Sequence, residues 1–534
     1  MRSRKKQNSA IQPASVVRIP AWCWASDMKQ VKPSAVVIGA GFSGMASALI
    51  LSMHGYKVSL VERAKKPGMT LRGFFRSRVY FDSGLHFVGE LSEKGLLSTY
   101  LRYLGMGDIP CVDFDQNCFE SIRFTDGSTF SMPIGYEAMI NSMVSTFPSE
   151  ERGILDYMKE MRAAYNTSAF HALHGPINSG DNNPNWQISL KDFIAARIHD
   201  NRLRTVLSLP CLYYGVSPTE ATFLQHARVA GTHFDSVRTF ECGGLSLVKA
   251  CEKRMAEEDV DVLCGLAVTK ITCSTAGTLS GVTLDNGEHI GSSVVIYTGH
   301  PAALSDILPD GALREASKKR LRNLHDTISA HILYMSTESN PPTALDKKNV
   351  FVCRHDEPFD RAFDRGRRLS DGPFYVMSGP SVLSRHTDEL GAGYSKAIDY
   401  VAVVPGYASE YAAFSGSGSG KRPLGYRDLK QRKLSEFSEA LFKACPDFSG
   451  LKIVDGATPL TLQKYLNTPN CGLYGAAHCM SQFNPLPMTR VPNLFIAGQA
   501  VAAPGIIGSL ISAFLACGFV AGHEALLNEV RSCR

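Results

Sequence analysis

A short apolar run that ends in the glycine-rich stretch Gly39-Ala40-Gly41-Phe42-Ser43-Gly44 constrains this chain more than any other feature of its sequence. The run itself, Ala35–Ile38, predicts a buried parallel strand, and the residues from Ser43 to His54 predict a helix that stops at Gly55. Tyr56–Val61 predicts a second strand, which completes a strand–helix–strand unit. In this context the G-x-G-x-x-G pattern indicates a Rossmann-type dinucleotide-binding fold.

Each glycine of the pattern has a separate physical task. Gly39 permits the tight turn, Gly41 lets a pyrophosphate approach the backbone, and Gly44 lets helix and strand pack closely. The amino end of the helix, at Phe42 and Ser43, would stabilise the phosphate charge. Glu62 ends the second strand, eighteen residues after Gly44, where a carboxylate can accept hydrogen bonds from the ribose hydroxyls.

Two further segments indicate which dinucleotide is bound. Arg63-Ala64-Lys65-Lys66-Pro67-Gly68, followed by Phe81-Asp82-Ser83-Gly84-Leu85-His86, resembles the FAD-containing amine oxidase and phytoene desaturase superfamily. Near the C-terminus, Val491–Gln499, Pro504-Gly505 and Gly508 resemble the closing flavin motif of that superfamily. In the superfamily the first of these segments ends in a Pro-Gly-Gly turn that an arginine follows. Here Met69 stands in place of the second glycine of that turn, and the arginine appears only at Arg72.

The resemblance implies a non-covalently bound FAD. The residues expected to hold it are Gly39, Gly41, Phe42, Ser43, Gly44, Glu62, Arg63, Arg72, Ser83, Gly84, the backbone of Val268, Gly498, Gln499, Gly505 and Ile507. No metal site is expected.

Within the superfamily the chain is most similar to the branch of retinol saturases, carotenoid isomerases and bacterial polyene-modifying oxidoreductases. The stretch Asp82–Gly89, the turn Gly243-Gly244 before a helix, and Tyr474-Gly475 leading to Gln482 carry this similarity. It implies saturation of a carbon–carbon double bond in an apolar polyene (retinoid, carotenoid or acyl-polyene, free or tethered to a carrier) by hydride transfer and protonation. NAD(P)H is a candidate electron donor.

Two other functions stay open. A carotenoid-type desaturase or a cis–trans isomerase would use the same flavin cradle. A non-enzymatic flavin or prenyl carrier of the same fold is the alternative from a different class.

Protonation requires a titratable side chain beside the flavin. His86 is the first candidate, because it follows the glycine expected to approach the flavin. Tyr214 and His226 are further candidates, and Glu241 is a weaker one.

The fold class expected is α/β, with a Rossmann-type FAD-binding domain (a parallel sheet plus a β-meander) interleaved with a mixed α+β substrate domain. At 534 residues the chain is too long to fold around a single hydrophobic core of ordinary size. We expect a disordered extension (1–30), FAD-binding segments (31–100, 238–300 and 449–534) and substrate-domain segments (101–237 and 301–448). Leu190–Ile198 is one expected helix, and Ser415–Gly420 is expected to be a mobile loop.

Composition narrows the setting of the protein. A net charge of +6, spread thinly, gives no reason to expect a nucleic acid partner. The fourteen cysteines include no CxxC pair, and no signal peptide is recognisable, so reduced thiols in the cytoplasm are expected, with peripheral membrane contact as an open alternative. The uncharged stretch from Leu494 to Gly522 is interrupted by glycine and proline, which favours a strand, a tight turn and a buried helix over a membrane span.

Overall fold

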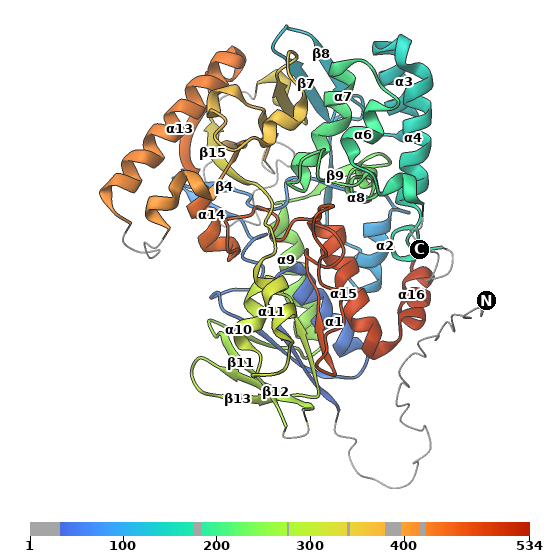
Figure 1. Cartoon of the computed structure of the whole chain (residues 1–534), viewed down its shortest axis with the longest axis vertical. Helices are drawn as coiled ribbons and strands as arrows, with labels where there is room; N and C mark the ends of the chain where they lie inside the picture. Colours follow the sequence, from blue (N-terminus) through green and yellow to red (C-terminus); the bar gives the residue numbers. More distant parts are fainter. Residues whose placement is uncertain (1–31, 175–182, 275–276, 339–341, 380–396, 416–421) are drawn as a thin grey trace, which may run out of the picture. The chain divides into compact units, whose positions relative to one another are not determined.

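The computed structural model describes residues 32–174, 183–274, 277–338, 342–379, 397–415 and 422–534. The expected extension 1–30 lies outside the described residues, and so does the loop Ser415–Gly420 apart from its first residue. The described residues from Pro33 onward form one compact unit. Two large sheets organise this unit (Figure 1).

The first sheet is parallel throughout and contains both strands predicted around the glycine pattern. Its order is β10 (Asp261–Cys264), β2 (Lys57–Glu62), β1 (Ser34–Ile38), β14 (Val294–Tyr297) and β20 (Leu494–Ile496). The central strand is almost fully buried, as expected for a parallel sheet covered on both faces.

Helices that share one apolar core cover one face of this sheet. They are α1 (Phe42–Met53), α9 (Gly244–Glu257), α15 (Gly505–Ala521), α16 (His523–Ser532) and α2 (Leu96–Tyr103). The other face packs against the predicted meander, β11 (Val268–Cys273), β12 (Leu279–Leu284) and β13 (His289–Gly291), and against α10 (Pro301–Ile307) and α11 (Glu315–Arg322). Both predicted parts of the FAD-binding fold, the parallel sheet and the meander, are confirmed.

The stretch from Leu494 onward forms the strand β20, a turn and the buried helix α15, as predicted. Throughout the described ranges, none of the helices combines the length and the apolar character that crossing a bilayer requires.

The second sheet has seven strands and was not foreseen from the sequence. Its order is β19 (Lys452–Ala457), β15 (Ser329–Thr337), β18 (Ile398–Gly406), β17 (Phe374–Ser378), β16 (Asn349–Cys353), β7 (Glu120–Phe124) and β8 (Thr129–Met132). Only β16 and β7 pair in parallel; the other neighbours are antiparallel. β19 belongs to this sheet although the predicted boundary stands at 448/449; the domain limits remain predictions.

Side chains alternate between the two faces of this sheet, as the pleat of a strand dictates. The outer face packs against α13 (Leu424–Ala444), which is orange in Figure 1. The inner face belongs to a core shared with α3 (Tyr136–Thr146), α4 (Glu151–Tyr165), α6 (Leu190–Ala195), α7 (Asn201–Ser208) and α8 (Phe223–Ala230). Smaller elements complete the unit: the hairpin β3 (Phe74–Arg76) and β4 (Val79–Phe81), the sheet of β5 (Val88–Gly89), β9 (Val237–Phe240) and β6 (Cys111–Asp113), and the helices α5 (Ala169–Ala172) and α14 (Pro459–Leu466).

One helix is shorter than predicted. The pattern Leu190–Ile198 forms a helix only as far as Ala195. A carboxylate oxygen of Glu150 accepts hydrogen bonds from the backbone N–H groups of His199 and Asp200, at 2.9 and 2.7 Å. The Asp200 side chain in turn caps α7, so the chain turns into a new helix.

Candidate active site

The glycine pattern forms a close junction between β1, α1 and the strand β14. Gly39 has a φ of +100°, and a Cβ on Gly44 would lie 1.8 Å from the Gly39 carbonyl oxygen, so neither position accepts a side chain. The Thr298 hydroxyl, just after β14, donates to the carbonyl oxygens of Ile38 and Gly39 at 2.9 and 3.1 Å. Sequence analysis did not single out Thr298.

Gly41 differs from its neighbours because it faces open space. It is the N-cap of α1, and a Cβ there would meet no atom within 4 Å. No side chain of the described residues caps this helix, and its first turn holds no acidic residue. Its free N–H groups therefore suit an external anion such as a pyrophosphate.

A second uncapped helix begins nearby. Gly505 opens α15 with a φ of +86° and also faces open space. α15 packs along α1, and the hydroxyls of Ser43 and Ser512 lie 3.1 Å apart. Ser512 also accepts a hydrogen bond from the backbone N–H of Gly498 at 2.7 Å, which ties the end of β20 to this pair of helices. Ile507 is buried in the core beneath.

Glu62 lies at the end of β2, beside the turn. Its carboxylate oxygens accept from the backbone N–H groups of Ala40 and Ala64, both at 2.7 Å. Each oxygen keeps a further lone pair that can accept a ribose hydroxyl. The N–H of Leu266 donates to the Glu62 carbonyl at 3.1 Å, which places the start of β11, and thus Val268, close to this carboxylate.

Ser83, Gly84 and His86 belong to the loop that leads from β4 to β5. The Ser83 hydroxyl donates to the Thr70 carbonyl at 3.1 Å, and a Cβ on Gly84 would lie 2.1 Å from that same oxygen. Nδ1 of His86 is buried and has no hydrogen-bond partner among the described residues. Burial lowers the pKa of His86 to about 4, so its imidazole is neutral at pH 7.

Other predicted residues lie apart from this junction or are engaged elsewhere. Arg63 is exposed and donates to the Asn467 side chain at 3.1 Å, and Arg72 pairs with Glu252 and donates to the Pro67 carbonyl at 2.8 Å. Gln499 is exposed, and its carbonyl oxygen lies 2.7 Å from Nε2 of His478.

Tyr214 and His226 form a pair in the core on the inner face of the seven-stranded sheet. Both are fully buried, and the Tyr214 hydroxyl lies 3.0 Å from Nδ1 of His226 and 3.0 Å from the Cys211 sulfur. Burial lowers the pKa of His226 to about 3. A catalytic role for either residue remains a prediction.

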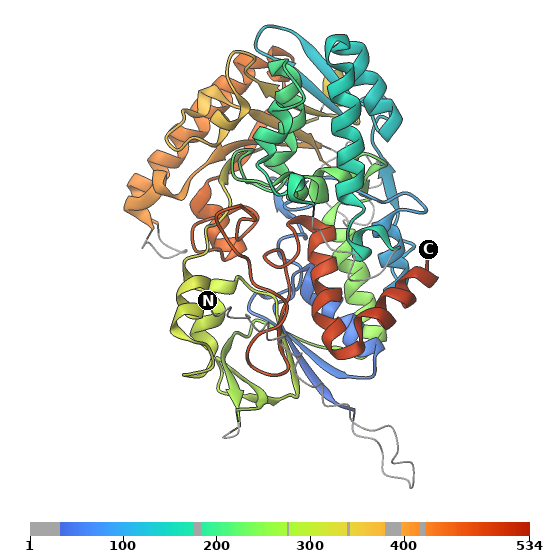
Figure 2. The ribbon, with the colours of Figure 1, turned by 45° about the vertical axis from the view of Figure 1, so that its right-hand side comes forward.

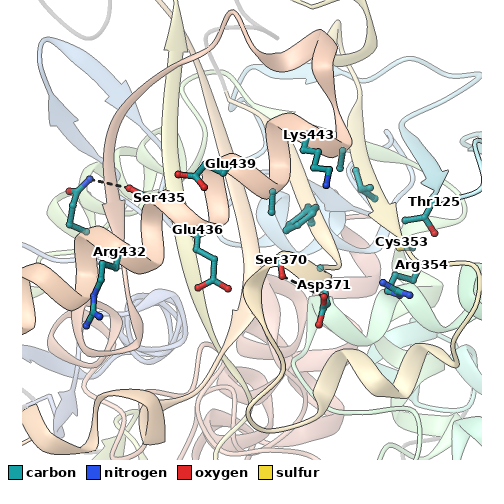
Figure 3. A pocket seen from close by; sticks show the side chains of 16 residues that line it. Thr125, Cys353, Arg354, Ser370, Asp371, Arg432, Ser435, Glu436, Glu439 and Lys443 are labelled. Carbon is teal, nitrogen blue, oxygen red and sulfur yellow. Dashed lines mark hydrogen bonds between the residues drawn. The ribbon is translucent and has the colours of Figure 1, made fainter.

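A pocket of about 730 Å³ lies elsewhere, between α13 and the outer face of the seven-stranded sheet (Figure 3). Charged side chains line it, among them Arg354, Asp371, Glu436 and Lys443. None of the predicted site residues belongs to it.

The comparisons with known proteins agree with this geometry. Residues 42–389 match the model of the flavin-containing amine oxidoreductase family. The chain belongs to this family. As a member it is an FAD-dependent oxidoreductase, and the two uncapped helices, the open space at Gly41 and the carboxylate of Glu62 fit that cofactor.

Relatives and solved structures extend the family assignment. All-trans-retinol 13,14-reductase of Macaca fascicularis is 24% identical over 91% of this chain and 85% of its own length. A zeta-carotene-forming phytoene desaturase of Myxococcus xanthus is 25% identical over 65% of this chain and 68% of its own. Among solved structures, an oxidoreductase from Methanosarcina mazei shares the fold with a TM-score of 0.64 at 15% identity, covering 90% of this chain and 98% of that one.

Proposed function

We propose that this flavoprotein saturates a carbon–carbon double bond of a conjugated, apolar polyene: a retinoid, a carotenoid or an acyl-polyene, free or tethered to a carrier. The similarity to all-trans-retinol 13,14-reductase along 91% of the chain is the observation that carries this proposal. It extends through both large sheets, so it includes the half of the molecule that would receive the substrate as well as the flavin cradle.

Aromatic side chains beside the inner face of the seven-stranded sheet support the proposal that the substrate is apolar. Phe87 directly follows His86, and its ring lies 5.5 Å from Tyr213, 5.4 Å from His233 and 6.3 Å from Tyr375. Phe87, Tyr213 and His233 all keep part of their surface exposed. Aromatic side chains of this kind offer apolar contact to a flat conjugated chain.

The chain's own residues would hold the cofactor and move one proton. When bound, FAD supplies the hydride chemistry. The N-termini of α1 and α15 would hold its phosphates and its ring end, and Glu62 would hold the ribose; the uncapped helix ends and the free lone pairs of Glu62 support this assignment. Nδ1 of His86 has no partner among the described residues and could bind the flavin or the substrate, but its low pKa makes it a hydrogen-bonding group rather than an acid at pH 7.

Anaerobic mixing of the reduced protein with retinoids, carotenoids and acyl-polyenes tests this function, with NADH and NADPH as alternative sources of electrons. We expect flavin reoxidation with a polyene and a product heavier by two hydrogens. Anaerobic mixing of the oxidised protein with the same compounds tests the alternative: flavin reduction with loss of two hydrogens from the product would instead establish a desaturase. An unchanged mass with altered geometry would establish an isomerase. Binding without any turnover would favour the carrier function.

A peripheral contact with a membrane belongs to the same proposal, because polyenes partition into lipid. The segment between α14 and β20 carries Met480, Phe483, Leu486 and Met488, whose exposed fractions are 51%, 82%, 74% and 56%. This segment is part of the red coil left of α15 in Figure 2. Apolar side chains exposed together in one segment are typical of an interaction surface.

Polar contacts hold the inward side of this segment. The Gln482 side chain accepts from the backbone N–H of His325 at 2.6 Å, and the Asn484 side chain donates to the Ala500 carbonyl at 3.0 Å. Exposed Lys319 and Arg320 lie on α11, which ends just before His325, and exposed Arg490 follows the segment. Within the described residues no acidic side chain pairs with these three cations, so they can meet anionic headgroups.

Co-sedimentation with anionic phosphatidylserine vesicles tests this contact. The double variant F483S/L486S should bind such vesicles more weakly than the wild type, and neutral phosphatidylcholine vesicles should retain less of either protein. The matched control L155S/I188S changes two other exposed apolar residues and should bind like the wild type. Equal binding by all three proteins would contradict the contact.

A further inference from the structure

A buried carboxylic acid lies on the inner face of the seven-stranded sheet. Glu120 begins β7, where residues 120, 122 and 124 point inward, and it is the acidic member of an otherwise apolar set. Its exposed fraction is 0%. An acid at an inward position of an alternating strand is costly unless its oxygens have partners, so Glu120 requires an explanation.

Two tyrosines bind this carboxylate. The hydroxyl of Tyr213 donates to one oxygen at 2.5 Å, and the hydroxyl of Tyr375 donates to the other. Asn349 donates to the Tyr375 oxygen at 3.2 Å. No lysine or arginine of the described residues forms an ion pair with Glu120. The group is therefore a carboxyl held only by neutral hydrogen-bond donors.

The neighbouring titratable groups are neutral as well. Tyr474 lies close enough to influence both tyrosines electrostatically. The His233 ring lies 5.3 Å from that of Tyr213, and Cys353 and Cys118 lie near the carboxyl. Burial raises the pKa of Glu120 to about 7, although the two tyrosine hydrogen bonds oppose this shift. Burial also lowers the pKa of His233 to about 4, so this imidazole carries no charge at pH 7.

Tyr213 connects this group to the proposed substrate site. Its ring contacts Phe87, the residue after His86, and also stands 6.3 Å from the ring of Tyr375. Tyr213 keeps part of its surface exposed, whereas Glu120 and Tyr375 are buried. Among the residues that bind the carboxyl, Tyr213 is therefore the one from which a proton could pass to the exposed side.

We propose that Glu120, Tyr213 and Tyr375 form a proton-holding site for the reduction of the polyene, with Tyr213 as the member that faces the substrate. This inference rests on the proposed function. The π bond of the alkene is broken, one carbon gains the hydride that reduced FAD supplies, and the other gains the proton of the Tyr213 hydroxyl. The protonated carboxyl of Glu120 returns a proton to Tyr213 and is left as a carboxylate bound by both hydroxyls.

Infrared difference spectroscopy of the resting holoenzyme between pH 5 and pH 9 tests the site without turnover. The wild type should lose the C=O band of a protonated carboxyl as the pH rises through about 7. Asp82 has a similarly raised pKa, so the band of Glu120 is identified by its absence in Glu120→Gln. Tyr400→Phe is the matched control: Tyr400 lies on the opposite face of the sheet, and its hydroxyl has no partner among the described residues.

Single-turnover reoxidation by the best polyene gives the second measurement. The wild-type rate should fall as the pH rises through about 7, and Tyr213→Phe should lower it by roughly 100-fold, as loss of a general acid does. Glu120→Gln should lower the rate and abolish the pH inflection, while Tyr400→Phe keeps both.

The outcomes separate this inference from the function on which it rests. Polyene turnover with the wild-type inflection retained in Glu120→Gln and Tyr213→Phe would overturn the proton-holding site alone. An infrared spectrum that is the same in the wild type and Glu120→Gln would also overturn it. Failure of the wild type to turn over any polyene would overturn the proposed function, and the role of the site with it.

Discussion

The buried carboxylate of Asp82 accepts a hydrogen bond at 2.9 Å from the backbone N–H of Gly244, which lies 162 residues further along the chain. Its other oxygen accepts from Ser83 at 2.7 Å. The loop that carries Ser83, Gly84 and His86 is thereby fixed to the amino end of α9. A Cβ on Gly244 would lie 2.3 Å from the Leu71 carbonyl oxygen, so this junction leaves no room for a side chain.

Asp82→Ala should destabilise this junction. It removes the acceptor of the buried Gly244 N–H group, which we expect to lower the free energy of unfolding by about 1–3 kcal/mol at pH 5. Urea unfolding measures this change. The exposed Asp285→Ala serves as the control and should change stability by less than about 0.5 kcal/mol.

The same residue gives a pH dependence. Burial raises the pKa of Asp82 from 3.8 to about 7. The unfolded chain releases this proton near its ordinary pKa and the folded chain only near pH 7, so this contribution to stability is lost as the pH rises between those values. Unfolding of the wild type should show this slope, and Asp82→Ala should show a smaller one. An identical slope in both proteins would contradict the assignment.

Gly41→Ala and Gly44→Ala form a matched pair at the flavin cradle. Gly41 has an ordinary φ of −69° and open space around it, so Gly41→Ala should fold like the wild type and bind FAD at least about 10-fold more weakly, a loss of about 1.4 kcal/mol. Gly44→Ala should reduce stability itself, because its Cβ would collide with the Gly39 carbonyl. Thermal unfolding of the apoproteins and FAD titration separate the two effects. Unchanged FAD affinity in Gly41→Ala would argue against pyrophosphate binding there.

His86 should remain neutral across the physiological range. Its folded pKa, lowered to about 4, lies below the ordinary value of 6.5, so the stability it contributes is present above pH 6.5 and lost as the pH falls through about 4. NMR of ring-labelled histidine should show no titration of His86 between pH 5 and pH 8, with His86→Gln used for assignment. A midpoint near 6.5 would place His86 in a more hydrated setting than the structure shows.

The sequence predicted those parts of the fold that depend on neighbouring residues. The strand–helix–strand unit, the meander and the buried C-terminal helix follow from local patterns of glycines, β-branched residues and turns. The seven-stranded sheet depends on pairings such as Asn349 with Glu120, 229 residues apart, which no local pattern encodes. The helix predicted for Leu190–Ile198 ends early, at Ala195, because Glu150, far away in sequence, accepts a hydrogen bond from the backbone just beyond it.

The candidate site shows the same division. The glycines and Glu62 could be placed because their spacing reflects one local motif. Glu120, Tyr213 and Tyr375 come from three separate segments, so their contact could not be foreseen. The one available signal was the acid at an inward position of the alternating strand Glu120–Phe124.

The flavin content of the purified protein tests the central claim most directly. Protein produced with ample riboflavin should be yellow and should release one FAD per chain on denaturation, since no covalent link is proposed. A colourless protein that takes up no added FAD would contradict the account.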